Sequence, residues 1–224
     1  MAAAHQPAKG RDKKSTHSAK RKPNQKSRNA TAVRMVPAAR VPAVVETMAA
    51  PSGTARFAAG KELSVTAEKD PERVYPHFDT IAALLESKSK VVCWNALQIV
   101  GSLAGVDTQG KIAALLGRYL AFIGGGDLVS AANAIQGAGR IGRLRPELLD
   151  RIVPAVLAVE QATFKTAECG KVAAGAALEA FCKMGPTVCA RNEVTAFIRR
   201  QMNSTRPAVA RRAKEMAAEL EALD

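Results

Sequence analysis

The chain has 224 residues, of which 47% are hydrophobic but only 4% are aromatic, and its formal net charge is +13 at pH 7. The length allows one sizeable domain with a tail and excludes two full-sized domains joined by a linker. Few aromatic residues and abundant alanine favour helices over a sheet. The sequence has no apolar run of about 18 to 20 residues, so it predicts no transmembrane helix.

Most of the charge belongs to the N-terminus, since residues 1–40 contain eleven Lys or Arg and one Asp. Residues 1–35 have hardly an apolar side chain larger than alanine and are expected to form a disordered basic tail. This tail could neutralise nucleic-acid phosphates through salt-sensitive contacts, or it could only solubilise the chain. In a eukaryote, its AKRKP motif (19–23) would pass for a nuclear localisation patch. The predicted phosphate anchors are Lys13, Lys14, Lys20, Arg21, Lys22, Lys26 and Arg28.

The next segment, residues 36–70, is rich in Ala, Pro and Val and predicts a semi-extended linker with a short helix around 42–50. From residue 71 onward, apolar residues recur with the period of a helix. A glycine run at 124–126 ends one of these helices, and Asp127 is placed to cap the next. Periodicity predicts eight helices and no strand, at 77–88, 90–105, 110–126, 127–142, 146–159, 166–185, 192–203 and 206–223.

These helices repeat along the chain. Segment 95–105 superposes on segment 133–143 with a shift of 38 residues, which places Gln98 on Gln136. Related slots recur further on with shifts of 43 and 36 residues. Helix pairs that repeat at such intervals are typical of an α-solenoid. We therefore expect residues 71–224 to form a right-handed α-solenoid of about four helix pairs.

The repeats resemble those of HEAT-like proteins, including bacterial variants linked to phycobilin lyases. The resemblance covers about residues 71–224 and is carried by IAALLES (81–87), VVCWNALQIVGSLAG (91–105) and ANAIQGAGRIGRLRPELLDRIVPAVL (132–157). Residues 87–88 are Ser-Lys, where the family usually has a turn aspartate. The resemblance implies an armadillo-like superhelix, a fold used by scaffolds, inhibitors, regulators and a few enzymes.

The segment QGAGRIGRLRP (136–146) has Gly137, Gly139 and Gly142 in the spacing of a dinucleotide-binding fingerprint. That fingerprint requires a strand before the first glycine and a helix that begins after it. Here the preceding residues are alanine-rich and helical, and Gly139 has a repeat counterpart in Gly101. We therefore expect these glycines to let neighbouring helices approach closely.

The second helices of the pairs, near 91–104, 128–143, 168–184 and 207–221, are expected to line a concave face that binds a protein partner. Polar residues that recur at one slot of an alanine-rich helix indicate an exposed surface. The predicted surface residues are Trp94, Asn95, Gln98, Asn133, Gln136, Arg140 and Arg143.

Alternative roles remain open for several of these residues. Asn95 and Asn133 could instead cap or bridge adjacent repeats, and Trp94 could be half-buried in packing. Arg140 and Arg143, with the nearby Arg145, could face a ligand or could complement the negative end of a helix dipole.

The cysteines and the other polar residues provide no recognisable active site. Cys93, Cys169, Cys182 and Cys189 lack zinc-site spacing and nearby histidines, so we expect free thiols in a reducing cytoplasm and no metal or cofactor. HEAT-like alkylpurine DNA glycosylases use several aromatic side chains with an aspartate, whereas this chain has a single Trp. We predict a non-enzymatic module that binds a protein partner, with nucleic-acid association as the alternative.

Overall fold

The computed structural model describes residues 33–222, which are all-helical and contain no strand. Most of the expected basic tail, residues 1–32, lies outside the described residues. The α-helices are α1 (Val41–Ala49), α2 (Ala55–Lys69), α3 (Pro71–Val74), α4 (Phe78–Ala83), α5 (Lys90–Ser102), α6 (Lys111–Ala121), α7 (Leu128–Leu144), α8 (Leu149–Leu157), α9 (Ala167–Met184), α10 (Pro186–Cys189), α11 (Asn192–Gln201) and α12 (Pro207–Glu221). Short 3-10 helices lie at Ala38–Arg40, Tyr75–His77, Leu84–Glu86, Leu103–Val106, Pro146–Leu148 and Ala158–Glu160.

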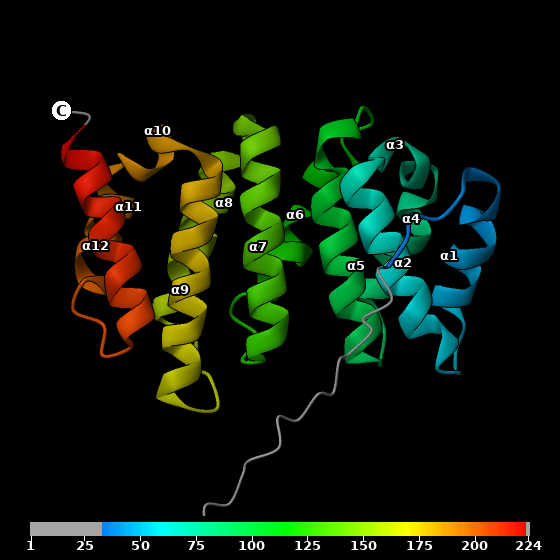
Figure 1. Cartoon of the computed structure of the whole chain (residues 1–224), viewed down its shortest axis with the longest axis horizontal. Coiled ribbons are helices and arrows are strands. Elements are labelled where there is room, and N and C mark those ends of the chain that lie inside the picture. Colours follow the sequence, from blue (N-terminus) through cyan, green and yellow to red (C-terminus); the bar gives the residue numbers. More distant parts are fainter. Residues whose placement is uncertain (1–32, 223–224) are drawn as a thin grey trace, which may run out of the picture. The chain divides into compact units, whose positions relative to one another are not determined.

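Helices α2, α5, α7, α9 and α12 pack side by side in chain order (Figure 1). Each has a partner from the preceding segment: α1 packs on α2, α4 on α5, α6 on α7, α8 on α9 and α11 on α12. Segments one helix pair apart in the sequence thus become neighbours in space. The row contains one pair more than the four that were expected, and the additional pair is α1 with α2.

Helices α1 and α2 occupy the segment 36–70, where a semi-extended linker was expected. Helix α1 matches the short helix expected around 42–50, whereas α2 was not expected. Pro42 lies in the first turn of α1, where its missing N–H breaks no helical hydrogen bond. The compact unit accordingly begins at Val33 and not at Pro71.

The first two helices share the core of the others. Met48 of α1 and Leu63 of α2 are buried in it, and one continuous cluster of buried residues extends from Val36 to Met216. The Thr66 hydroxyl, fully buried in α2, accepts the Val36 N–H at 2.9 Å and donates to a carbonyl one turn earlier. This bond joins the start of the described chain to α2.

The eight helices predicted beyond residue 71 are all present, with ends shifted by a few residues. Asp127 caps α7 as expected, because its Oδ2 accepts the N–H of Ser130 at 3.3 Å. Gly126 has a φ of 77°, the left-handed conformation that favours glycine. The turn between α6 and α7 therefore follows from the sequence.

The glycines of α7 lie against neighbouring helices, which confirms their predicted packing role. A Cβ built on Gly137 would lie 1.7 Å from the Tyr119 hydroxyl oxygen of α6, and one on Gly139 would lie 3.0 Å from the Ala180 Cα of α9. Gly101 of α5, the repeat counterpart of Gly139, also lies against a neighbouring helix, since its built Cβ would lie 2.7 Å from the Gly137 Cα of α7. The fingerprint spacing thus reflects close contact between α5, α7 and α9.

Candidate functional site

Trp94 projects from α5 toward α7 and is half-buried. Its indole Nε1 donates a hydrogen bond to the Ser130 hydroxyl at 2.9 Å. That hydroxyl in turn donates to Asp127 Oδ2 at 2.6 Å, and Lys90 lies 3.6 Å from the same carboxylate. The indole is therefore held in a chain of polar contacts at the beginning of α7, and it matches the half-buried packing alternative.

Gln98 and Asn133 form a bridge between α5 and α7. The Gln98 side-chain Nε2 donates to Asn133 Oδ1 at 2.7 Å, and Asn133 Nδ2 donates to the Val129 carbonyl at 2.8 Å. Asn133 is only 9% exposed. Of the two roles left open for Asn133, bridging of adjacent helices is therefore the one observed.

Asn95 occupies the equivalent slot on α5 but has a different environment. It is also only 9% exposed, and its side-chain Nδ2 is buried without a hydrogen-bond partner. The amide packs against Gly60 of α2, where an added Cβ would lie 2.4 Å from Nδ2. A buried donor without a partner costs free energy, so Asn95 stands apart from its bridged counterpart.

The remaining predicted surface residues lie along one stripe of α7. Gln136 and Arg143 are exposed. The Arg140 side chain is 25% exposed and makes two long contacts, Nη1 to the Ser102 hydroxyl at 3.4 Å and Nη2 to Glu68 Oε1 at 3.9 Å. Arg140 therefore carries a guanidinium with most of its donor capacity unused.

A recess of about 220 Å³ crosses helices α2, α5 and α7. It brings together three of the predicted residues, Asn95, Gln98 and Arg140. Its lining consists of Val33, Lys61, Ser64, Val65, Glu68, Asn95, Gln98, Ser102 and Arg140. We call this feature the α2–α5–α7 groove.

The contribution of α2 to the groove was missed because its segment was expected to be a linker. Lys61, Ser64, Val65 and Glu68 are spaced at i, i+3, i+4 and i+7, which places them on one face of a helix. That polar stripe was the available signal. The predicted phosphate anchors of the tail lie outside the described residues.

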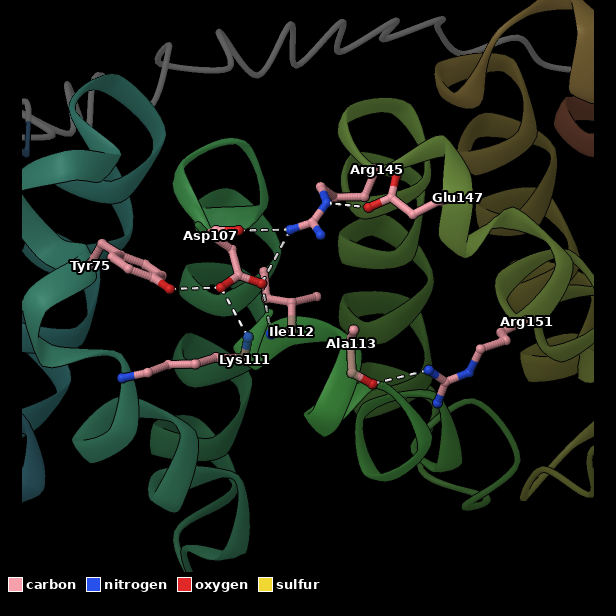
Figure 2. Close-up of polar contacts among 8 residues, drawn as sticks. All are labelled: Tyr75, Asp107, Lys111, Ile112, Ala113, Arg145, Glu147 and Arg151. Carbon is pink, nitrogen blue, oxygen red and sulfur yellow. Dashed lines mark hydrogen bonds and ion pairs between the residues drawn. The ribbon is translucent and has the colours of Figure 1, made fainter. Parts of the chain in front are cut away.

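A second polar cluster joins the segments between helices (Figure 2). The Asp107 carboxylate accepts hydrogen bonds from Tyr75 Oη at 2.6 Å and from the backbone N–H groups of Lys111 and Ile112 at 3.0 and 2.9 Å. Arg145, just after α7, donates to the Asp107 carbonyl at 2.9 Å and to its carboxylate at 3.2 Å. Arg145 thus has a structural role.

The hydrogen bonds to Asp107 also set its protonation. Burial by itself disfavours the ionised carboxylate and would raise its pKa. The bonds from Tyr75 and the two backbone N–H groups, together with the charge of Arg145, outweigh that effect, and the pKa of Asp107 is lowered. Asp107 therefore remains ionised in a pH range where an ordinary aspartate becomes protonated.

A larger cavity, of about 530 Å³, lies beside the beginning of α5 and the end of α6. Its charged groups are already paired, Arg118 with Glu86 at 2.5 Å and Lys90 with Asp127 at 3.6 Å. Cys93 also lines it, and burial raises the pKa of this thiol. A thiol with a raised pKa is a poor nucleophile at neutral pH, so this cavity presents no activated group.

Two further properties concern the described residues alone. Within residues 33–222, no three His, Cys, Asp or Glu side chains are grouped so that they could hold a metal ion. No helix of this part has both the length and the apolar character needed to cross a bilayer.

Comparisons with known proteins give a likeness of fold. No family model and no curated protein matches the sequence. The chain is similar to a crystal structure of an engineered protein, with a TM-score of 0.52 and 15% sequence identity over 84% of this chain and 85% of that chain. At this identity the likeness concerns the arrangement of helices.

Proposed function

We propose that the chain is a non-enzymatic helical-repeat module, a right-handed α-solenoid of HEAT-like helix pairs that binds a protein partner. The binding surface would be the face formed by α2, α5, α7, α9 and α12. The chain-order packing of five helix pairs supports the solenoid, because each pair contacts mainly its neighbours.

The observation that carries the proposal is the α2–α5–α7 groove. It crosses three helices of the row and is lined by polar groups whose hydrogen-bonding capacity is only partly used. The stripe of α7 beside it also exposes Val129, at 42%. Binding surfaces commonly combine apolar side chains with polar groups that fix orientation.

A protein partner is favoured over nucleic acid by the ion pairs of the array. Many cations pair with a carboxylate 32 to 41 residues earlier in the chain, so their charge joins successive helix pairs and is less available to phosphate. These pairs are Lys111–Asp79, Arg118–Glu86, Arg145–Asp107, Arg191–Asp150, Arg200–Glu160, Arg206–Glu168 and Arg212–Glu179.

The proposal is tested by affinity capture with two charge-reversal variants of the full chain. Arg143→Glu changes an exposed residue in the last turn of α7, and Arg199→Glu changes an exposed residue in the last turn of α11 as a matched control. We expect a nuclease-resistant protein partner to be captured by the wild type and Arg199→Glu, and to be depleted with Arg143→Glu. Capture abolished by nuclease, or equal for both variants, would refute the proposal.

A further inference from the structure

The α2–α5–α7 groove contains more hydrogen-bond donors than its acceptors can use. Its only carboxylate is Glu68, whereas Lys61 and Arg140 are both cationic, and the contacts of Arg140 leave most of its N–H donors unused. Lys61 has no ion pair among the described residues. A site with surplus donors and surplus positive charge is complementary to an anion.

Arg140 is the donor best suited to hold that anion. Its side chain is largely covered, which limits competition from water, yet its two contacts are at 3.4 and 3.9 Å. A guanidinium has five N–H donors in a planar fork that matches a carboxylate with two parallel hydrogen bonds. Glu68 is placed as an internal substitute, and its side chain is 65% exposed and so can swing away.

We infer that the α2–α5–α7 groove binds an acidic side chain of a peptide, with its carboxylate on Arg140 and with Lys61 as a further donor. This inference rests on the proposed function, because it assigns the chemistry of the partner at the same face. A carboxylate fits better than a phosphomonoester, since a phosphomonoester carries up to two negative charges beside Glu68.

The charge of the whole molecule favours the same partner. Residues 33–222 contain 24 Lys and Arg and 18 Asp and Glu, and residues 1–32 add nine more Lys and Arg against one Asp. Val33, where the described chain begins, lines the groove. A positively charged protein attracts an acidic partner at low ionic strength, and the groove would then select a carboxylate by hydrogen bonding.

The inference is tested by fluorescence anisotropy of a labelled hexaglutamate peptide with the full chain at about 50 mM salt, where charge contacts are strong. Arg140→Gln should weaken binding about tenfold or more. Arg199→Gln removes the same charge from an exposed position in the last turn of α11, outside the groove, and should weaken binding about twofold or less. A hexaglutamine peptide should not bind.

A second pair of variants keeps the inference falsifiable if Arg140→Gln perturbs folding. Glu68→Gln removes the internal substitute and should tighten hexaglutamate binding several-fold, whereas Glu72→Gln removes an equal charge from an exposed position outside the groove and should do so much less. If the two variants of either pair change hexaglutamate affinity equally, binding depends on net charge alone, and the inference is overturned.

The same variants are also titrated with labelled oligo-dT, to distinguish recognition of a carboxylate from recognition of a phosphate. If Arg140→Gln weakens oligo-dT binding and leaves hexaglutamate binding unchanged, the inference is wrong. Its failure is distinguishable from failure of the proposed function, which depends on capture of a partner by Arg143→Glu and Arg199→Glu. Partner capture that responds to Arg143→Glu together with hexaglutamate binding that ignores Arg140→Gln would reject the inference alone.

Discussion

Arg140, on α7, and Arg145, just after its C-terminal end, have similarly exposed side chains but differ in how closely polar groups contact them. The Arg140 side chain is 25% exposed and that of Arg145 is 22% exposed. Arg145 contacts Glu147 at 2.5 Å and Asp107 at 2.9 and 3.2 Å, whereas the contacts of Arg140 are at 3.4 Å or longer. The exposed fraction of a side chain therefore does not distinguish a structural cation from one that is available to a partner. The two arginines differ instead in their short polar contacts, which Arg145 makes and Arg140 lacks.

The largest effect is expected where the polar groups are fully paired. Asp107→Ala removes the acceptor of four hydrogen bonds and leaves Tyr75 and Arg145 without it. We expect the free energy of unfolding to fall by about 3 to 5 kcal/mol, the range for breaking a buried charged pair. Urea denaturation at pH 7 measures this change, and a loss below about 1 kcal/mol would contradict the structural role.

A smaller effect is expected from the buried side of α7. Gly137→Ala places a methyl group 1.7 Å from the Tyr119 hydroxyl oxygen, which is hydrogen-bonded to the Leu97 carbonyl at 2.8 Å. Because neighbouring groups must shift to relieve that clash, the free energy of unfolding should fall by about 1 to 3 kcal/mol.

Gly117 is the control for this substitution, because no atom lies within 4 Å of a Cβ built there. Gly117→Ala lies in α6 and should raise the free energy of unfolding by about 0.4 to 1 kcal/mol. Equal changes in thermal stability for the two variants would refute the close approach of α6 and α7.

The Asp107 cluster also predicts a pH dependence with a definite sign. Because the pKa of Asp107 is lowered on folding, the unfolded chain binds the proton more tightly, and stability falls as the solution is acidified. The contribution is fully present above the ordinary value of about 3.9 and is lost as pH falls through the lower folded pKa. Denaturation from pH 7 to 3 should therefore show wild type and Asp107→Asn converging below about pH 4; a constant difference would contradict this assignment.

The smallest effect on stability is expected at Arg140. Because its contacts are few and long, Arg140→Gln should change the free energy of unfolding by less than about 1 kcal/mol. Urea denaturation of Arg140→Gln and Asp107→Ala under the same conditions compares the two losses of stability directly. A loss above about 2 kcal/mol would place Arg140 among the structural arginines.

The helices could be predicted from the sequence where large apolar residues mark the helical period, as they do beyond residue 71. Helix α2 could not, because its buried residues are Ala59, Gly60, Thr66 and Ala67, with Leu63 as the one large apolar residue among them. Small buried residues give almost no periodic pattern of hydrophobicity, so the sequence of this segment resembles a linker. Its packing against α5 is visible only in the structure.

The candidate site was predictable only in part. Recurrence of polar residues at one slot predicted an exposed face that includes Asn95, Gln98 and Arg140; all three line the groove, although Asn95 is only 9% exposed. The hydrogen bond from Gln98 to Asn133 was not predictable, because it depends on how α5 and α7 are aligned in space. Lys61 and Glu68 were missed together with α2, although both complete the groove.

The central claim is that the open side of α7 is built to receive an acidic partner at Arg140. The most direct measurement is the affinity of the full chain for labelled hexaglutamate in the wild type, Arg140→Gln and Arg199→Gln. The account predicts about a tenfold or greater loss for Arg140→Gln and about a twofold or smaller loss for Arg199→Gln. Equal losses in the two variants would contradict it.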